Sequence, residues 1–195
     1  VVREFYYDHA DEDVRRHTDE AIERLRLAGA EVREVGLPPS FYTHEWARGV
    51  VMSVEAATFH HEMYTQNPDE YGPMLRRTIE AGLLSSGVQY LQAQRVRRQF
   101  RRDMEAMLGA VDVLLTPATP SSAPRDRTTT GNALFQGPWT SCGLPAVAVP
   151  SGLDSTGMPL GIQLAGAPFA EARLLAAARW CESALDVHLE PPGLE

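Results

Sequence analysis

The spacing of apolar residues changes twice within the first 40 positions. VVREFYY (residues 1–7) is rich in β-forming residues and predicts a strand, and AEVREVGLPP (30–39) predicts a shorter strand that two prolines end. Between them we expect a helix, capped by Asp11 or Asp13 and ended at Gly29. Its apolar face repeats at close to the helical period, at Val14, Ile22, Leu25 and Ala28. This order predicts a βαβ unit with a right-handed crossover.

Residues 41–108 carry almost no strand signal and predict three helices. One passes through TFHHEMY, one follows Tyr71-Gly-Pro, and a long one follows Ser85-Ser86-Gly87, where serine is expected as the N-cap. The long helix has an apolar stripe at Val96, Phe100, Met104 and Met107 or Leu108. Its arginines lie mostly off that stripe, at positions 95, 98, 101 and 102. Such a run of charge is typical of a solvated face rather than an anion site.

From residue 111 the pattern becomes that of a sheet. VDVLLTPATP predicts a strand buried on both faces, and a Ser/Thr/Pro/Gly-rich loop, SSAPRDRTTTGN, follows it. PAVAVPSG and MPLGIQLAG predict a hairpin around LDSTG, with Val147 and Val149 alternating against Ile162 and Leu164. Residues 171–185 predict a closing amphipathic helix.

We therefore expect an α/β fold in which helices flank a mixed β-sheet. The 195 residues are expected to form a single unit in three consecutive parts. These are a βαβ unit (1–40), a helical part (41–110), and a part that holds the sheet, a pocket wall and the closing helix (111–195).

Composition narrows the possible functions. A formal charge of -8 argues against a direct nucleic-acid partner, which requires a basic stripe. No apolar run approaches the roughly 20 residues that span a bilayer. Two isolated cysteines predict neither a disulfide framework nor a thiolate metal site, so a reducing, cytoplasmic environment is expected. All 18 basic residues are arginine. The absence of lysine excludes any mechanism that needs a lysine base from within these residues.

Three motifs could carry chemistry, and each has a plainer explanation. His60-His61-Glu62 does not match the H-E-x-x-H zinc motif, so we reject a metal site there. Cys142 is the best internal nucleophile, but none of the six histidines stands in a recognisable cysteine-hydrolase context. A small buried residue beside a tight turn explains Cys142 more simply. Ser141 lacks the G-x-S-x-G elbow of serine hydrolases.

One long segment carries a family resemblance. TGNALFQGPWTSCGLPAVAVPSGLDSTGMPLGIQLAGAPFAEARLLAAARWCE (130–182) closely resembles the C-terminal end of the amidase signature family. These are serine amidases, and they include one of the chains of the tRNA amidotransferases. VDVLLTPATPSSAP, LLSSGVQYLQAQRVRRQF and the βαβ segment resemble earlier parts of that fold, in family order. The resemblance identifies the chain as similar to the C-terminal portion of an amidase.

The resemblance implies a mechanism that this chain cannot complete. Relatives use a Ser–Ser–Lys triad and a glycine/serine-rich loop from their N-terminal half, and neither that loop nor any lysine occurs here. It also implies that the chain supplies a substrate-pocket wall. The residues expected in that wall are Thr116, Pro117, Asn132, Phe135, Trp139, Thr140 and Cys142. Core packing is an equally good explanation for Phe135 and Trp139.

Two of these positions depart from the family pattern. Thr140 stands where many relatives have asparagine, and Asn132 where some have an aspartate that contacts a polar substrate. Both departures favour an amide substrate other than glutamine alone.

The predicted function is the pocket-forming part of a serine amidase that acts on a small carboxylic amide through an acyl-enzyme. The chain is expected to be inactive alone and to need no metal or organic cofactor. Its expected partners are the N-terminal half of the amidase domain and, through unpaired edges of the strands VVREFYY and DVLLTP, a second copy. The alternatives are a noncatalytic binding or assembly module and, less favoured, a Cys142-dependent hydrolase.

Overall fold

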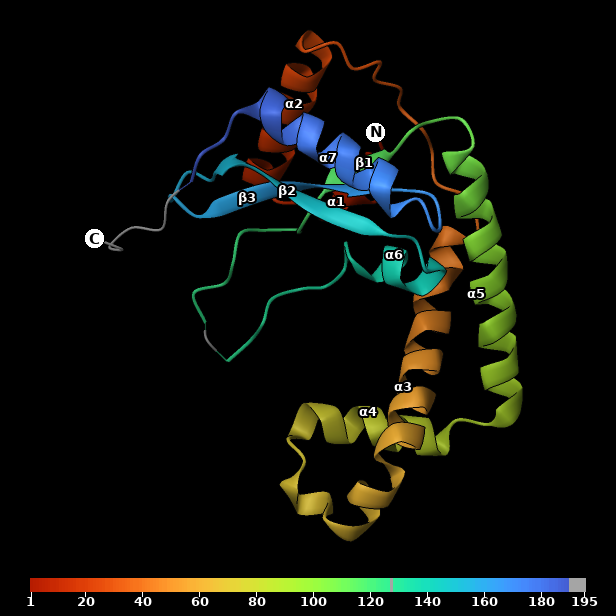
Figure 1. The fold of residues 1–195 in the computed structure, drawn as a ribbon. Coiled ribbons are helices and arrows are strands. Elements are labelled where there is room, and N and C mark those ends of the chain that lie inside the picture. The colour runs from red at the N-terminus through yellow and green to blue at the C-terminus, as the bar shows by residue number, and fades with distance from the viewer. Residues whose placement is uncertain (127, 190–195) are drawn as a thin grey trace. The chain divides into compact units, whose positions relative to one another are not determined.

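A computed structural model describes residues 1–126 and 128–189. Within them helices occupy the first part of the chain, and three short strands follow between Leu114 and Ala165 (Figure 1). The helices are α1 (Tyr6–His9), α2 (Glu12–Leu27), α3 (Phe41–Gln66), the 3-10 turn η1 (Pro68–Glu70), α4 (Pro73–Leu84), α5 (Gly87–Leu108), α6 (Gly137–Cys142) and α7 (Glu171–Leu185). The strands are β1 (Leu114–Pro117), β2 (Ala146–Leu153) and β3 (Pro159–Ala165). The α/β class, with helices flanking a sheet, is confirmed.

Contacts group the chain into two compact units. The first joins Val1–Leu37 to Met104–Glu195, and the second is Pro38–Asp103. The second unit corresponds closely to the helical part expected over residues 41–110. The first unit consists of the two stretches of sequence that come before and after this helical unit.

Local sequence signals set the ends of the helices. The Asp11 side chain, not that of Asp13, caps α2 by accepting a hydrogen bond from the Val14 amide at 2.8 Å. Gly29 follows that helix with φ of +108°, a conformation that favours glycine. Ser86 precedes α5, where its hydroxyl accepts from the Gln89 amide while the Gln89 side chain accepts from the Ser86 amide. This reciprocal pair is a capping box.

The sheet has the order β1-β3-β2, and both pairings are antiparallel. The predicted hairpin forms, with Val147 and Val149 against Ile162 and Leu164: Val147 pairs with Leu164 and Val149 with Ile162. A bulge between Pro150 and Gly152 interrupts the pairing. The three assigned strands are thus all antiparallel, whereas a mixed sheet was expected.

The first residues differ from the strand predicted over 1–7. Val2 donates to the Leu115 carbonyl at 3.0 Å, and Val1 accepts from the Val35 amide at 3.0 Å, so this end lies beside β1. The chain then turns at Phe5, where φ is 66°, into the short helix α1. The predictions of strands over 1–7 and 30–39 are wrong: only isolated backbone hydrogen bonds form there, and neither segment is a strand in the structure. β1 therefore has neighbours on both sides within this chain, contrary to the unpaired edges expected for it.

The helical unit is held together by close packing. An added Cβ at Gly82 would lie 2.0 Å from the Ser53 carbonyl oxygen, so α4 approaches α3 where only glycine fits. Phe100 of α5 contacts Phe41 and stacks on His44, with ring centroids 5.9 Å and 4.5 Å apart. Arg95, Arg98, Arg101 and Arg102 lie largely toward solvent, as expected for a solvated face.

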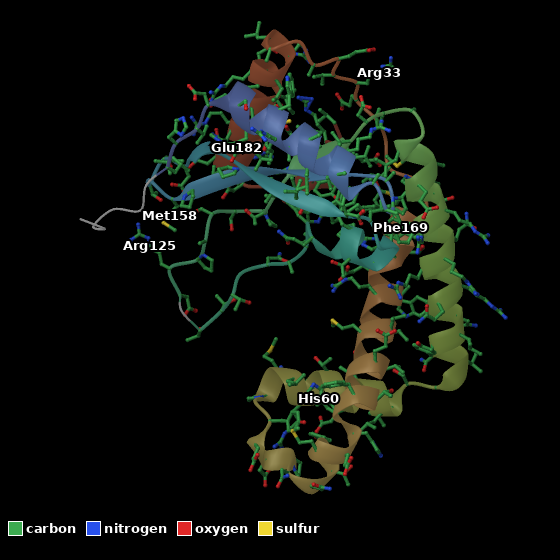
Figure 2. The ribbon with its side chains drawn as sticks, viewed as in Figure 1. Arg33, His60, Arg125, Met158, Phe169 and Glu182 are labelled. Atoms are coloured by element: carbon green, nitrogen blue, oxygen red, sulfur yellow. The ribbon has the colours of Figure 1, made fainter. Side chains whose placement is uncertain are left out.

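The His60 motif lies in α3 (Figure 2). The His60 ring contacts the Tyr71 hydroxyl at 3.1 Å. Among residues 1–126 and 128–189, no three His, Cys, Asp or Glu side chains gather in a way that could hold a metal ion. None of the helices in this described part is long and apolar enough to cross a membrane.

In the first unit, α2 and α7 lie on one side of the sheet and α6 on the other (Figure 1). The core between the sheet and these two helices is apolar, and its residues include Ile22, Leu25, Leu115, Val149, Ile162, Leu164, Leu174, Ala178, Cys181 and Leu185. Because strand side chains alternate in direction, Thr116 and Gln163 project from the opposite face.

Candidate substrate-binding wall

The helix α6 buries most of its residues and exposes Thr140. Pro138 occupies the first turn, and Gly143 ends the helix with φ of 70°. Trp139 and Cys142 are three positions apart and lie on the buried side of α6. Thr140 is offset from Trp139 by about 100° and is exposed. The helical period therefore separates two residues that the resemblance placed in one wall.

Three distant segments meet on the sheet face that α6 covers. Thr116 of β1 is paired with Gln163 of β3, and both are buried. The side-chain amide of Gln163 donates through Nε2 to the Phe135 carbonyl at 3.3 Å, which ties the segment before α6 to the sheet. This face carries Thr116, Phe135, Trp139 and Cys142 within one unit of the structure. We call these four residues, together with Tyr6 and Gln163, the wall cluster.

Tyr6 is the member of the wall cluster that the sequence did not reveal. Its ring lies edge-on to Phe135 with centroids 4.9 Å apart and is stacked on Trp139 at 6.1 Å. Tyr6 is fully buried, and this burial raises its pKa well above the ordinary value. The strand predicted over residues 1–7 gave no indication of this contact. The predicted strand already ended before the polar residues that begin at Asp8, so no local signal indicated that the chain turns at Phe5 and begins a helix at Tyr6.

The remaining predicted residues are placed differently. Pro117 is buried at the end of β1, next to Thr116. Asn132 is exposed, and its side-chain oxygen accepts from the Leu134 amide at 3.0 Å in a local turn. Residue 127, in the loop that leads there, lies outside the described residues. The structure thus brings Thr116, Phe135, Trp139 and Cys142 together and leaves Asn132 and Thr140 exposed.

Two polar atoms of the wall cluster are buried without a hydrogen bond. The Thr116 hydroxyl and the Trp139 indole N–H have no partner within the described part of the chain. An unpaired polar atom in a protein interior costs stability, and its presence in a native fold requires an explanation. A polar substrate or a further polypeptide segment would supply the missing acceptor and donor.

Cys142 is a poor isolated nucleophile. It is 1% exposed, and its thiol lies 3.5 Å from the Trp139 carbonyl oxygen, a weak contact typical of a core cysteine. Nucleophilic attack requires the sulfur to reach a substrate carbonyl as a thiolate. This burial favours a packing role.

The fold places the chain in the α/β class, with a sheet that has two apolar-packed helices on one face. The other face carries the wall cluster, which is aromatic and partly polar. The Amidase family profile matches residues 1–175. The chain belongs to the amidase family.

Relatives and solved structures agree with this membership. The chain is 35% identical to the glutamyl-tRNA(Gln) amidotransferase A chain of Geotalea daltonii, over 95% of this chain and 44% of that protein. It is also 35% identical to the corresponding protein of Mesorhizobium japonicum, over 94% of the chain and 42% of that protein. The chain therefore spans less than half the length of these relatives.

A structure described as "Crystal structure of amidase" superposes with a TM-score of 0.82 at 28% identity, covering 93% of this chain and 44% of that one. A second match, with a TM-score of 0.80 and 28% identity, comes from a vestigial protein complex related to the origin of an s-triazine catabolic enzyme. It covers 95% of this chain and 41% of that one.

Proposed function

We propose that this chain forms the substrate-pocket wall of a serine amidase and is inactive alone. The observation that carries the proposal is the wall cluster, in which two buried polar atoms have no hydrogen-bond partner among residues 1–126 and 128–189, in a chain that has no lysine. Family membership supports the reaction class. The Ser–Ser–Lys triad then belongs to polypeptide outside these 195 residues.

In the proposed reaction, a serine oxygen supplied by that polypeptide attacks the amide carbonyl. The C–N bond breaks as the leaving nitrogen takes a proton, and ammonia or an amine departs. Water then hydrolyses the acyl-serine to the carboxylic acid. The contribution of this chain is to orient the substrate once the other half is in place. Thr116, Phe135 and Trp139 are buried in this chain alone, so the proposal requires the wall cluster to open on assembly. Phe135 and Trp139 then provide apolar walls, while Thr116 and the Trp139 N–H provide hydrogen bonds.

Reconstitution tests this proposal. The chain alone should release no ammonia from a panel of carboxylic amides. Co-expression with the N-terminal half of an amidase relative should give turnover that is lost when the lysine of that half is replaced by alanine. Turnover by the chain alone that Cys142→Ala abolishes would instead establish the cysteine hydrolase. Tight amide binding without turnover in the reconstituted pair would establish a noncatalytic module.

We propose that the substrate is a carboxylic amide other than glutamine alone. The exposed Thr140 departs from the asparagine of many relatives and the exposed Asn132 from the aspartate of some, and both lie near Trp139 in the sequence. In the reconstituted enzyme, Asn132→Asp combined with Thr140→Asn should raise glutamine hydrolysis relative to other amides. Unchanged relative rates would remove this specificity assignment and leave the reaction class intact.

We also propose that the chain associates through its sheet when the rest of the amidase is absent. In the described residues β2 pairs only with β3, so its outer edge offers unpaired amides and carbonyls. Light scattering of the isolated chain should show a dimer or larger species, and adding the N-terminal half should replace it with a one-to-one complex.

Both cysteines are buried and neither is in a disulfide, which supports a reducing, cytoplasmic location.

A further inference from the structure

A cavity of about 560 Å³ lies on the opposite face of the same sheet from the wall cluster. Leu115 and Leu164 line it, and their neighbours Thr116 and Gln163 face the wall cluster. Its size falls within the range of small-molecule pockets, roughly 300–1,000 Å³. The sheet therefore separates this cavity from the site proposed for amide hydrolysis.

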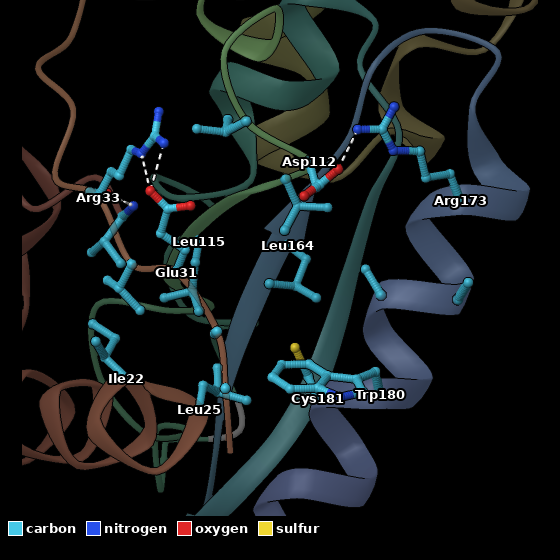
Figure 3. A pocket seen from close by; sticks show the side chains of 18 of the residues that line it. Ile22, Leu25, Glu31, Arg33, Asp112, Leu115, Leu164, Arg173, Trp180 and Cys181 are labelled. Atoms are coloured by element: carbon cyan, nitrogen blue, oxygen red, sulfur yellow. Dashed lines mark hydrogen bonds and ion pairs between the residues drawn. The ribbon is translucent and has the colours of Figure 1, made fainter. Parts of the chain in front are cut away.

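The helix α7 lines the cavity with a charged, two small and one aromatic side chain. Arg173, Ala176, Ala177 and Trp180 all line it, at the spacing that places residues on one side of a helix. Figure 3 shows Arg173 toward one end of this side of α7 and the Trp180 ring toward the other. Seven residues of helix span about 10 Å. The two small alanines leave room between the guanidinium and the indole.

The interior of the cavity is apolar and uncharged. Ile22 and Leu25 of α2 line it together with Leu115, Leu164 and Cys181. Burial raises the pKa of the Cys181 thiol to about 11, so the thiol is neutral near pH 7. A charged group among these side chains would lose its hydration without compensation, so the body of a ligand here must be apolar.

The rim of the cavity carries two guanidinium groups, each held by one carboxylate. Arg173 pairs with Asp112, and Arg33 pairs with Glu31 through contacts of 2.5 and 2.8 Å (Figure 3). The Arg173 and Asp112 side chains are 64% and 83% exposed, and ion pairs this exposed are weak. Arg173 can therefore exchange Asp112 for a ligand carboxylate, which a guanidinium binds through two parallel hydrogen bonds.

We propose that this cavity binds a medium-chain monocarboxylate. The carboxylate contacts Arg173, and the chain lies along Ala176 and Ala177 with its end against Trp180. The spacing along α7 sets the length of the ligand, the apolar interior requires an apolar chain, and Arg173, on exchanging Asp112 for the ligand, sets the negative charge of its end. This site stands independently of the proposed amide hydrolysis, because it lies on the other face of the sheet.

Titration calorimetry with octanoate tests the proposal, with 1-octanol as the uncharged ligand of the same length. The 195-residue chain should bind octanoate saturably at one site per chain. Arg173→Gln should weaken octanoate binding about tenfold while leaving 1-octanol binding unchanged. The matched control is Arg179→Gln, on the same helix but outside the cavity, which should bind octanoate as the unchanged chain does.

A pocket-filling variant tests the location. Ala177→Phe should reduce binding of both ligands at least about tenfold, since the ring occupies the space of the chain. Ala172→Phe, at an exposed position of α7 outside the cavity, should change neither. Circular dichroism checks that each variant is folded. Absence of saturable octanoate binding, or binding that neither Arg173→Gln nor Ala177→Phe weakens, would overturn the proposal.

Discussion

The two faces of the sheet are built from the same strands but are closed in different ways. On one face Leu115, Ile162 and Leu164 pack against α2 and α7 in an apolar core. On the other face Thr116 and Gln163 are buried, but Ala146 and Ala148 of β2 are exposed. The helices α2 and α7 thus cover the first face except at the cavity beside α7, whereas the second face is covered only in part.

The difference lies in what each face buries. The first face buries apolar side chains, whose removal from water stabilises the fold in proportion to their area. The second buries polar atoms, and two of these lack partners among the described residues. The first face therefore stabilises this chain. The second face leaves the Thr116 hydroxyl and the Trp139 N–H available for hydrogen bonds to a group from outside the described residues.

The largest expected effect is on the helix-covered face. Leu164 is fully buried there, so Leu164→Ala should lower the free energy of unfolding by about 2–5 kcal/mol through lost burial and a cavity. Ala148→Ser, on the exposed part of the other face, should change it by less than about 0.5 kcal/mol. Urea unfolding measures both. Equal effects would show that the two faces do not differ as described.

A smaller effect of opposite sign is expected at the wall cluster. Thr116→Val keeps the shape of the side chain and removes a buried hydroxyl that has no hydrogen bond within the described residues. It should raise the free energy of unfolding by about 1 kcal/mol. Thr119→Val, which removes a hydroxyl that donates to the Ser121 carbonyl, is the control and should not stabilise. A loss of stability in Thr116→Val would show that the Thr116 hydroxyl is satisfied.

The smallest effect concerns the turn that joins β2 to β3, the strands shared by both faces. Hydrogen bonds from the Met158 amide, the Ser122 hydroxyl and Thr156 lower the pKa of Asp154 from 3.8 to about 2. Because the folded pKa is lowered, the ionised carboxylate stabilises the fold above the ordinary pKa. That contribution disappears as the pH falls through about 2.

The Asp154→Ala variant should therefore be less stable than the unchanged chain near neutral pH, with the difference shrinking below pH 3.8. Urea midpoints measured between neutral pH and about pH 2 follow this difference. A difference that does not vary with pH would mean that the turn does not depend on the charge of Asp154.

Much of the fold could be predicted because its signals are local. Asp11 and Ser86 cap helices through residues three positions away, and α7 has the bounds that its composition indicated. The hairpin register followed from alternation, because a slip by one residue would exchange the two faces of the strands. The C-terminal block also carried the family resemblance that the profile match confirms.

The wall cluster could be predicted only in part. Phe135, Trp139 and Cys142 belong to one short segment, and resemblance was enough to select them. Tyr6 joins them from a distant part of the sequence, and no local pattern reports a contact of that kind. Thr140 lies outside the wall cluster because consecutive residues of a helix point about 100° apart, and its contact with a substrate stays a prediction.

The amino-acid sequence by itself determined the helix ends, the hairpin and the absence of a lysine base, since each depends on residue types or on spacings of a few positions. Only the tertiary structure decided that the first 37 residues pack with the last part of the chain, that Tyr6 completes the wall cluster and that α7 lines a cavity. The physical reason is that such contacts form between segments far apart in the chain. Their geometry depends on how the whole sheet and its covering helices pack together.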